Sequence, residues 1–248
     1  MFAVPAGFPY RLTRNLMIAA GVLYCSLILE AVAGYPLDVH ASFLSELGAL
    51  DQSTSLYARA GDLGAGVLVL FAAVLARPAA RMHRDVMGLM SSAALFGLST
   101  LADSFFPMDC APSASAACRI AEKHGHDGVE LVIHEVTSTL AGLGTIALGL
   151  FAILVLRRIG WAGVWGRAVA VLAAAVALTN AWLGIATGVE VVSGDDLHPP
   201  GVLQRVAILL LCVLLAVLLP ALKRGFSDDH LARAARNGRD RGGVRVAA

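Results

Sequence analysis

His134, Ser138 and Asp103 have the chemical types of a general base, a nucleophile and an orienting carboxylate. His134 and Ser138 are four residues apart, so a helix would place both on one face. Asp103 ends the preceding apolar segment, on a neighbouring helix. A histidine that bonds a carboxylate through one ring nitrogen and a hydroxyl through the other can activate that hydroxyl. The pattern predicts a hydrolytic site with His134 as base or metal ligand, and Ser45 is a second candidate for the serine near the reacting centre.

The residues around His134 also suggest a comparison with zinc sites. Residues 134–138 read His-Glu-Val-Thr-Ser, and Ser138 stands where the zinc-protease helix motif has its second histidine, so we exclude that motif. Imidazoles converging from two loops and a helix would still suit zinc. These are His124, His126, His134 and His198. Solvated loop histidines are the simpler interpretation, and the sequence leaves metal and other cofactors unknown.

Ionisable and amide side chains recur near the expected outer ends of five apolar segments. A charge at the centre of a bilayer costs at least about 2.5 kcal/mol, so such groups usually face a bundle interior or a water-filled cavity. We therefore predict an outward-facing polar cavity that binds a small or lipidic ligand. The alternative is that each group is interfacial, where water and snorkelling relieve the cost. The predicted cavity residues are Glu30, Glu46, Arg59, Asp62, Glu135, Asn180 and Arg205.

The chain that carries these residues is too apolar for a water-soluble protein. Of its 248 residues, 58% are hydrophobic and 15% are charged, and the mean hydropathy is +0.74. A helical span needs about 20 mostly apolar residues, and unpaired backbone groups are not tolerated in hydrocarbon. The segments that qualify are 15–34, 57–76, 86–106, 130–156, 166–189 and 201–222. The predicted fold is all-α, a polytopic bundle of six transmembrane helices, with the lipid bilayer as its first partner.

The distribution of Lys and Arg predicts the orientation of the bundle. All but Arg59, Arg119, Lys123 and Arg205 of the 19 basic residues fall on one side of it. Short cytoplasmic loops retain Lys and Arg, so both termini should be cytoplasmic and the protein should lie in the cell membrane. The net charge of +1 averages two opposite faces, and we find no RNA- or DNA-binding motif, so we expect no nucleic-acid partner.

Composition divides the chain into three parts. Residues 1–14 form a short cytoplasmic segment, 15–222 the transmembrane domain, and 223–248 a basic cytoplasmic tail. The tail cannot bury enough apolar area to offset its ordering entropy, so we expect it to be disordered. Within the outer segment 35–56, an apolar core at helical spacing should lie in the interface or dip back among the helices.

The four cysteines fall into two pairs by environment. Cys110 and Cys118 lie in one outer loop, where an oxidising compartment would let them form a disulfide. Cys25 and Cys212 lie inside apolar runs, where a cysteine is most simply a small packing residue.

Three short motifs occur in a fixed order. Residues 45–48 read Ser-Glu-Leu-Gly after the first span, and residues 106–109 read Phe-Pro-Met-Asp at the end of the third. His134 and Ser138 open the fourth. In this order the motifs resemble the bacterial and archaeal membrane proteins catalogued as domain of unknown function 998. The resemblance covers roughly residues 15–222 and implies a multi-pass architecture without naming a reaction.

Three functions stay open at this point. The first is binding of a small or lipidic molecule in the outer cavity, as a receptor, a transport-like protein or an accessory subunit. The second is an intramembrane hydrolase that uses His134 and Asp103, and the third is a structural scaffold for a protein partner. The inner halves of the spans are almost wholly apolar, so transport is the weaker form of the first. A separation above about 8 Å between Asp103 and His134 would exclude the hydrolase.

Overall fold

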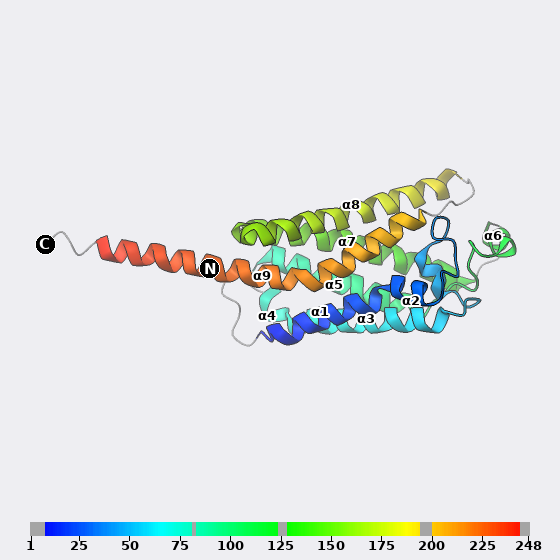
Figure 1. The fold of residues 1–248 in the computed structure, drawn as a ribbon, viewed down its shortest axis with the longest axis horizontal. Coiled ribbons are helices and arrows are strands. Elements are labelled where there is room, and N and C mark those ends of the chain that lie inside the picture. Colours follow the sequence, from blue (N-terminus) through cyan, green and yellow to red (C-terminus); the bar gives the residue numbers. More distant parts are fainter. Residues whose placement is uncertain (1–7, 81–82, 124–127, 194–199, 244–248) are drawn as a thin grey trace.

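A computed structural model of the chain describes residues 8–80, 83–123, 128–193 and 200–243 (Figure 1). No strand occurs in these ranges, which confirms the all-α prediction. The elements in chain order are α1 (Tyr10–Tyr24), α2 (Ser26–Val32), η1 (Leu44–Gly48), α3 (Ser55–Leu75), α4 (Arg77–Ala80), α5 (Arg84–Asp103), α6 (Ala116–Lys123), α7 (Val129–Arg158), η2 (Gly160–Ala162), α8 (Gly163–Ser193) and α9 (Gly201–Gly243).

Six helical stretches in the described residues are long and apolar enough to cross a membrane, as the sequence predicts. They are Tyr10–Val32, Ser55–Leu75, Arg84–Asp103, Val129–Arg158, Gly160–Val189 and Gly201–Lys223. Large apolar side chains also cover the outside of the bundle. On α8, Val171, Leu178 and Trp182 are each more than 60% exposed. Such a surface is stable against lipid and not against water, so the protein is a multi-pass membrane protein.

The first span differs from the single helix that the sequence predicts. Cys25 has φ −76° and ψ 69°, which interrupts the helix between α1 and α2. The Ser26 hydroxyl donates to the carbonyl oxygen of Tyr24 at 3.3 Å, so this carbonyl remains paired at the break. Polar backbone in a span must find a partner within the protein, and the Tyr24 carbonyl meets that condition here.

The six spans form a closed ring in which each packs against its neighbours in the chain. The order is α1, α3, α5, α7, α8 and α9, and contacts between α9 and α1 close the ring. Glycines allow the closest approaches: a Cβ at Gly66 of α3 would lie 2.7 Å from the Gly97 carbonyl oxygen of α5. Buried apolar residues such as Met17, Phe96 and Leu215 fill the interior.

The two ends of the ring have different connections (Figure 1). At the termini end, α1 begins and α9 leaves the bundle. At the opposite end, which we call the disulfide end, lie the segment 33–54 and the segment 104–123 that holds the cysteine pair. There, the apolar side chains of Leu37, Leu44, Leu47 and Met108 form a second buried cluster. The segment 35–56 therefore folds back onto the helices, as expected.

Disorder from residue 223 onward stays a prediction, and the structure draws part of this segment as a helix. In the structure α9 continues as a helix as far as Gly243, and residues 244–248 lie outside the described part of the chain. The tail sequence is rich in Ala and Arg, which are strong helix formers, and the preceding span supplies a helical turn from which it propagates. A helix can therefore continue without an apolar face to bury.

Candidate functional site

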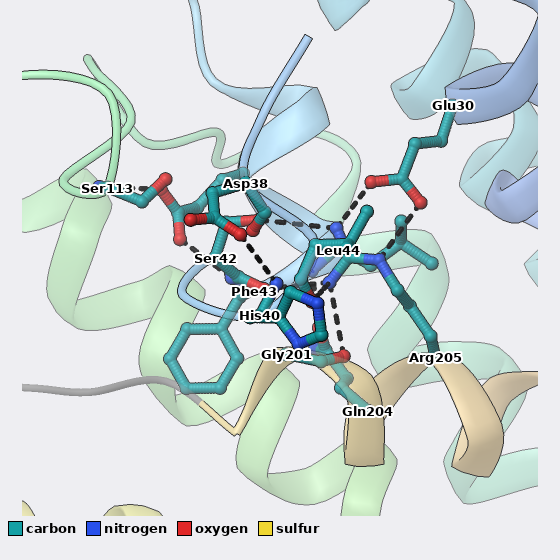
Figure 2. A network of polar contacts seen from close by, with 12 residues as sticks. Glu30, Asp38, His40, Ser42, Phe43, Leu44, Ser113, Gly201, Gln204 and Arg205 are labelled. Carbon is teal, nitrogen blue, oxygen red and sulfur yellow. Dashed lines mark hydrogen bonds and ion pairs between the residues drawn. The ribbon is translucent and has the colours of Figure 1, made fainter. Parts of the chain in front are cut away.

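At the disulfide end, a buried ion pair joins the first and last spans. Arg205 of α9 is 7% exposed and Glu30 of α2 is 1% exposed. The Arg205 Nε donates to Glu30 Oε2 at 2.9 Å, and Nη2 donates to Oε1, so the pair is bidentate (Figure 2). Two parallel charge-assisted hydrogen bonds make this one of the stronger polar contacts in proteins. The pair fixes α9 to α2 across the ring closure.

Arg205 also holds the outer loop against the bundle. Its Nη1 donates to the carbonyl oxygens of Val39 at 3.1 Å, Ser42 at 2.9 Å and Gly201 at 3.1 Å, and Nη2 donates to the Ser42 hydroxyl at 3.2 Å (Figure 2). The donors of the guanidinium group are thus occupied by protein acceptors. These contacts give Glu30 and Arg205 a structural part in holding α9, α2 and the outer loop together, and their place in a ligand cavity stays a prediction.

Glu46, the acidic residue of the Ser-Glu-Leu-Gly motif, closes the same loop. It is 2% exposed, and its Oε1 accepts from the Phe43 backbone N–H at 2.8 Å. Its Oε2 accepts from the Ser113 N–H at 2.9 Å and from the Ser113 hydroxyl at 2.5 Å. Gln204 of α9 accepts from the Leu44 N–H (Figure 2). The motif therefore caps η1 and ties it to the cysteine loop.

A second polar cluster lies deeper, between α5 and α7. The Asp103 Oδ1 is 3.1 Å from the Nδ1 of His134. His134 is buried, with 8% of its surface exposed. The Thr137 hydroxyl donates to Asp103 Oδ1 at 2.5 Å, and the Ser138 hydroxyl lies 3.1 and 3.2 Å from the two carboxylate oxygens. Three side chains of α7 thus contact the one carboxylate of Asp103.

The contacts of His134 determine where its proton lies. Nδ1 faces two acceptors, Asp103 Oδ1 at 3.1 Å and the Phe106 carbonyl oxygen at 3.1 Å, so it must carry a hydrogen. In the neutral ring Nε2 is then the acceptor. Nε2 has no hydrogen-bond partner within the described ranges. This is the tautomer that a general base needs, with its basic nitrogen available.

Asp62 of α3 lies beside this cluster. Its carboxylate interacts electrostatically with both Asp103 and His134, and Tyr24 of α1 is close enough to interact with Asp62 and Asp103. Asp62 is half-buried, and among the described residues its side chain makes no hydrogen bond or ion pair. We call Tyr24, Asp62, Asp103 and His134 the acidic cluster. Four spans contribute to it.

The other predicted residues do not join the acidic cluster. Arg59 donates from Nε to the Ser104 carbonyl oxygen at 3.0 Å, and Asn180 donates to the Val176 carbonyl oxygen of its own helix at 2.9 Å. Glu135 is exposed on α7. Ser45 is half-buried in η1 and forms no side-chain hydrogen bond in the described part of the chain. The residues predicted to share one cavity therefore divide among several separate contacts.

Sequence reasoning did not include Tyr24. It lies in the middle of the first apolar run, and no neighbouring charge marks it. Its ring packs edge-on against Phe96 of α5, with 5.1 Å between the ring centroids, and this contact holds it inside the ring of helices. Only the packing of α1 against α3 and the ring contact with Phe96 give it a polar neighbour.

The cysteine loop contains a disulfide between Cys110 and Cys118, with 6.1 Å between their Cα atoms. Asp51 accepts from the Ala111 N–H at 3.1 Å, which attaches the loop to the segment before α3. The described residues contain no group of three His, Cys, Asp or Glu side chains that could hold a metal ion. Of the histidines considered for zinc, His124, His126 and His198 lie outside the described residues.

A model of the family described as protein of unknown function, DUF998, matches residues 17–220. The chain belongs to this family. The match includes at least part of every span and both polar clusters, and it agrees with the resemblance drawn from the three short motifs. No curated protein and no solved structure matches the chain.

Proposed function

We propose that this DUF998 protein binds an amine-bearing amphiphile, such as a lipid with a primary amine in its headgroup, at the acidic cluster. The observation that carries the proposal is the half-buried Asp62 carboxylate on α3, a span that packs against α5, because it makes no hydrogen bond or ion pair in the described residues. An ionisable group within a span usually has a partner or faces a site of function. A ligand would supply that partner.

The charge of the cluster favours a cationic group. Two carboxylic acids, Asp62 and Asp103, accompany one imidazole in the cluster, so its acidic groups outnumber its basic groups. The nearest basic alternative on the same helix, Arg59, is bonded to the Ser104 carbonyl oxygen. Opposite charges attract strongly where water is scarce, so an ammonium group is the best complement.

Binding of short-chain phosphatidylethanolamine to the purified protein in neutral detergent tests this function. Isothermal titration should show that Asp62→Asn weakens binding by at least about tenfold, the usual value of a charge-assisted hydrogen bond. Glu135→Gln is the matched control, since Glu135 is exposed on α7. Unchanged binding of phosphatidylethanolamine by Asp62→Asn, or an equal loss of phosphatidylglycerol binding in this variant, would contradict the proposal.

A second candidate is hydrolysis of a lipid ester, and the His134 tautomer favours it. Nε2 would take a proton from water, the hydroxide oxygen would attack the carbonyl carbon, and Nε2–H would return the proton to the departing alkoxide. Asp103 would orient the ring through Nδ1 at 3.1 Å. Ser138 donates to Asp103 instead of His134, so water is the better nucleophile.

Release of a fluorescent group from a lipid ester in proteoliposomes tests the hydrolase. His134→Gln should lower the rate by about 100-fold or more, the usual contribution of a general base, while Ser138→Ala retains most of it. Absence of hydrolysis by the wild-type protein over a range of acyl chain lengths would exclude the hydrolase and leave ligand binding as the proposed function. A scaffold role for a protein partner has no specific contact in its favour.

The orientation belongs to the same proposal: the protein lies in the cell membrane with both termini cytoplasmic. The bias of Lys and Arg toward the termini end and the disulfide at the opposite end both support it. Reporter fusions after residue 243 and in the cysteine loop test it. A reporter active only outside the cell when fused after residue 243 would reverse the assignment.

A further inference from the structure

An apolar cavity of about 120 Å³ lies at the termini end of the bundle, away from the acidic cluster. Side chains of α1, α3, α5, α7 and α9 line it. Small residues create the space, because Ala72, Ala73, Ala76 and Ala93 stand where larger side chains would fill the ring. Between the spans, a strip of alanines thus leaves a hollow among otherwise close-packed helices.

The shape of the cavity follows the helix axes. Its lining extends over residues 10–17, 69–76, 86–93 and 148–155. Seven residues at a rise of 1.5 Å each make the hollow roughly 10 Å long. It is narrow because its volume is small for that length. A single hydrocarbon chain has these proportions.

The chemistry of the walls excludes water as a stable occupant. Thr13 is the one hydroxyl-bearing lining residue besides Tyr10, and its hydroxyl already donates to the Pro9 carbonyl oxygen at 3.1 Å. Buried water needs two to four polar partners, so it would not be held here. An empty apolar cavity forfeits dispersion contacts with every wall. An apolar chain restores them.

The polar side chains that line the cavity lie at the end of the cavity nearest the termini. Tyr10 begins α1, Lys223 ends the last span, and the Lys223 ammonium lies 4.4 Å from the centre of the Tyr10 ring. Arg11, Arg77 and Arg84 are exposed at the same end of the bundle. A positive rim over an apolar hollow complements an anionic headgroup with its acyl chain.

We propose that this cavity binds one acyl chain of an anionic glycerophospholipid, with Lys223 beside the headgroup phosphate. The second acyl chain lies on the lipid-facing surface of the bundle. This site is separate from the acidic cluster, and it does not depend on the function proposed for that cluster.

Photocrosslinking tests where the chain lies. A phosphatidylglycerol with a diazirine in one acyl chain is reconstituted with the full-length protein, irradiated, and the labelled peptides are identified by mass spectrometry. Labelling should concentrate on lining residues of α3 and α5, such as Ala76 and Met90. Labels found only on outward side chains, such as Val171 at 70% exposure and Leu178 at 69%, would overturn the proposal.

Two variants separate the apolar and the charged part of the site. Ala76→Phe fills the hollow and should reduce crosslinking to Met90 by about tenfold. Lys223→Gln should weaken phosphatidylglycerol binding, measured by native mass spectrometry, by about fivefold. Val164→Phe on α8 is the control for Ala76→Phe, since it adds a phenyl ring at an exposed position outside the lining. Arg167→Gln on α8 is the control for Lys223→Gln, since it removes an exposed positive charge outside the lining.

The identity of the headgroup is tested in the same measurements. Phosphatidylcholine should bind about fivefold more weakly than phosphatidylglycerol to the wild type, and equally to Lys223→Gln. Equal binding of the two lipids to the wild type, or retention of oleate in place of phospholipid, would overturn the assignment. If Ala76→Phe does not fold, the crosslink positions and Lys223→Gln still decide the question.

Discussion

The disulfide end and the termini end of the bundle are held together in different ways. At the disulfide end, buried Glu46 and Arg205 bond backbone groups of two loops, and Glu30 pairs with Arg205. At the termini end, the ion pair between Arg158 and Asp85 is partly exposed, and the interior is an apolar hollow. One end depends on specific hydrogen bonds, and the other on contact among small apolar side chains.

This difference follows from the connections at the two ends of the bundle. Long loops with polar backbone can lie against a bundle only if their N–H and C=O groups find partners, and the buried carboxylates and guanidinium group supply them. Short connections at the termini end have no such need. A site for polar ligand groups is therefore expected at the first end and a site for hydrocarbon at the second.

The largest expected effect is at the disulfide end. Arg205→Ala leaves Glu30 buried without a partner and should lower the free energy of unfolding by about 3–5 kcal/mol. Titration with a denaturing detergent, followed by circular dichroism, measures it. The control is Glu135→Ala, an exposed charge on α7. A loss no larger than that of the control would mean that this end does not rest on the ion pair.

The disulfide should have the next largest effect. Replacing Cys110 and Cys118 by Ser opens a loop whose ends are eight residues apart, which should cost about 2–3 kcal/mol. The comparison variant is Cys212→Ser, which leaves this loop closed. Maleimide labelling of both Cys110 and Cys118 before any reductant is added would refute the bond itself.

Within the acidic cluster the expected effect is smaller. Ser138→Ala removes a hydrogen bond to Asp103 between two spans, and such bonds are worth about 1 kcal/mol in membranes. Thr139→Ala, at the exposed neighbouring position, should change stability little. If both variants unfold at the same detergent fraction as the wild type, the bond from Ser138 contributes nothing to the fold.

The smallest effect is expected at the termini end. Arg158 is 40% exposed where its Nε meets Asp85 Oδ2 at 2.8 Å, so Arg158→Ala should cost about 0.2–1 kcal/mol, less at high salt. The neighbouring exposed Arg157 provides the control through Arg157→Ala. A cost above that of Arg205→Ala would reverse the comparison between the two ends.

Much of the architecture could be predicted from local pattern. Each apolar run is continuous in sequence and long enough to span, so its helix follows from the run itself, and the match of 130–156 with α7 illustrates this. The break at Cys25 was not predicted, since Ser26 restores the lost bond through its side chain and no Pro or Gly marks the position.

The acidic cluster was only partly predictable. His134 and Ser138 share a helix face at their spacing, and both contact Asp103, yet the sequence did not indicate that Ser138 would bond the carboxylate instead of the imidazole. Asn180 was expected in the same cavity and bonds its own helix. Depth in a span can be estimated from sequence, whereas the direction of a side chain around the helix depends on packing.

The sequence by itself determined the number of spans, the all-α class and the candidate pairing of Cys110 with Cys118, because each depends on residues close together in the chain. The order of three short motifs indicated the family. Only the tertiary structure decided that Arg205 pairs with Glu30, 175 residues away, and that alanines from several spans leave one hollow. Those contacts arise when the ring of helices closes, since helix rotation and neighbour order fix which side chains meet.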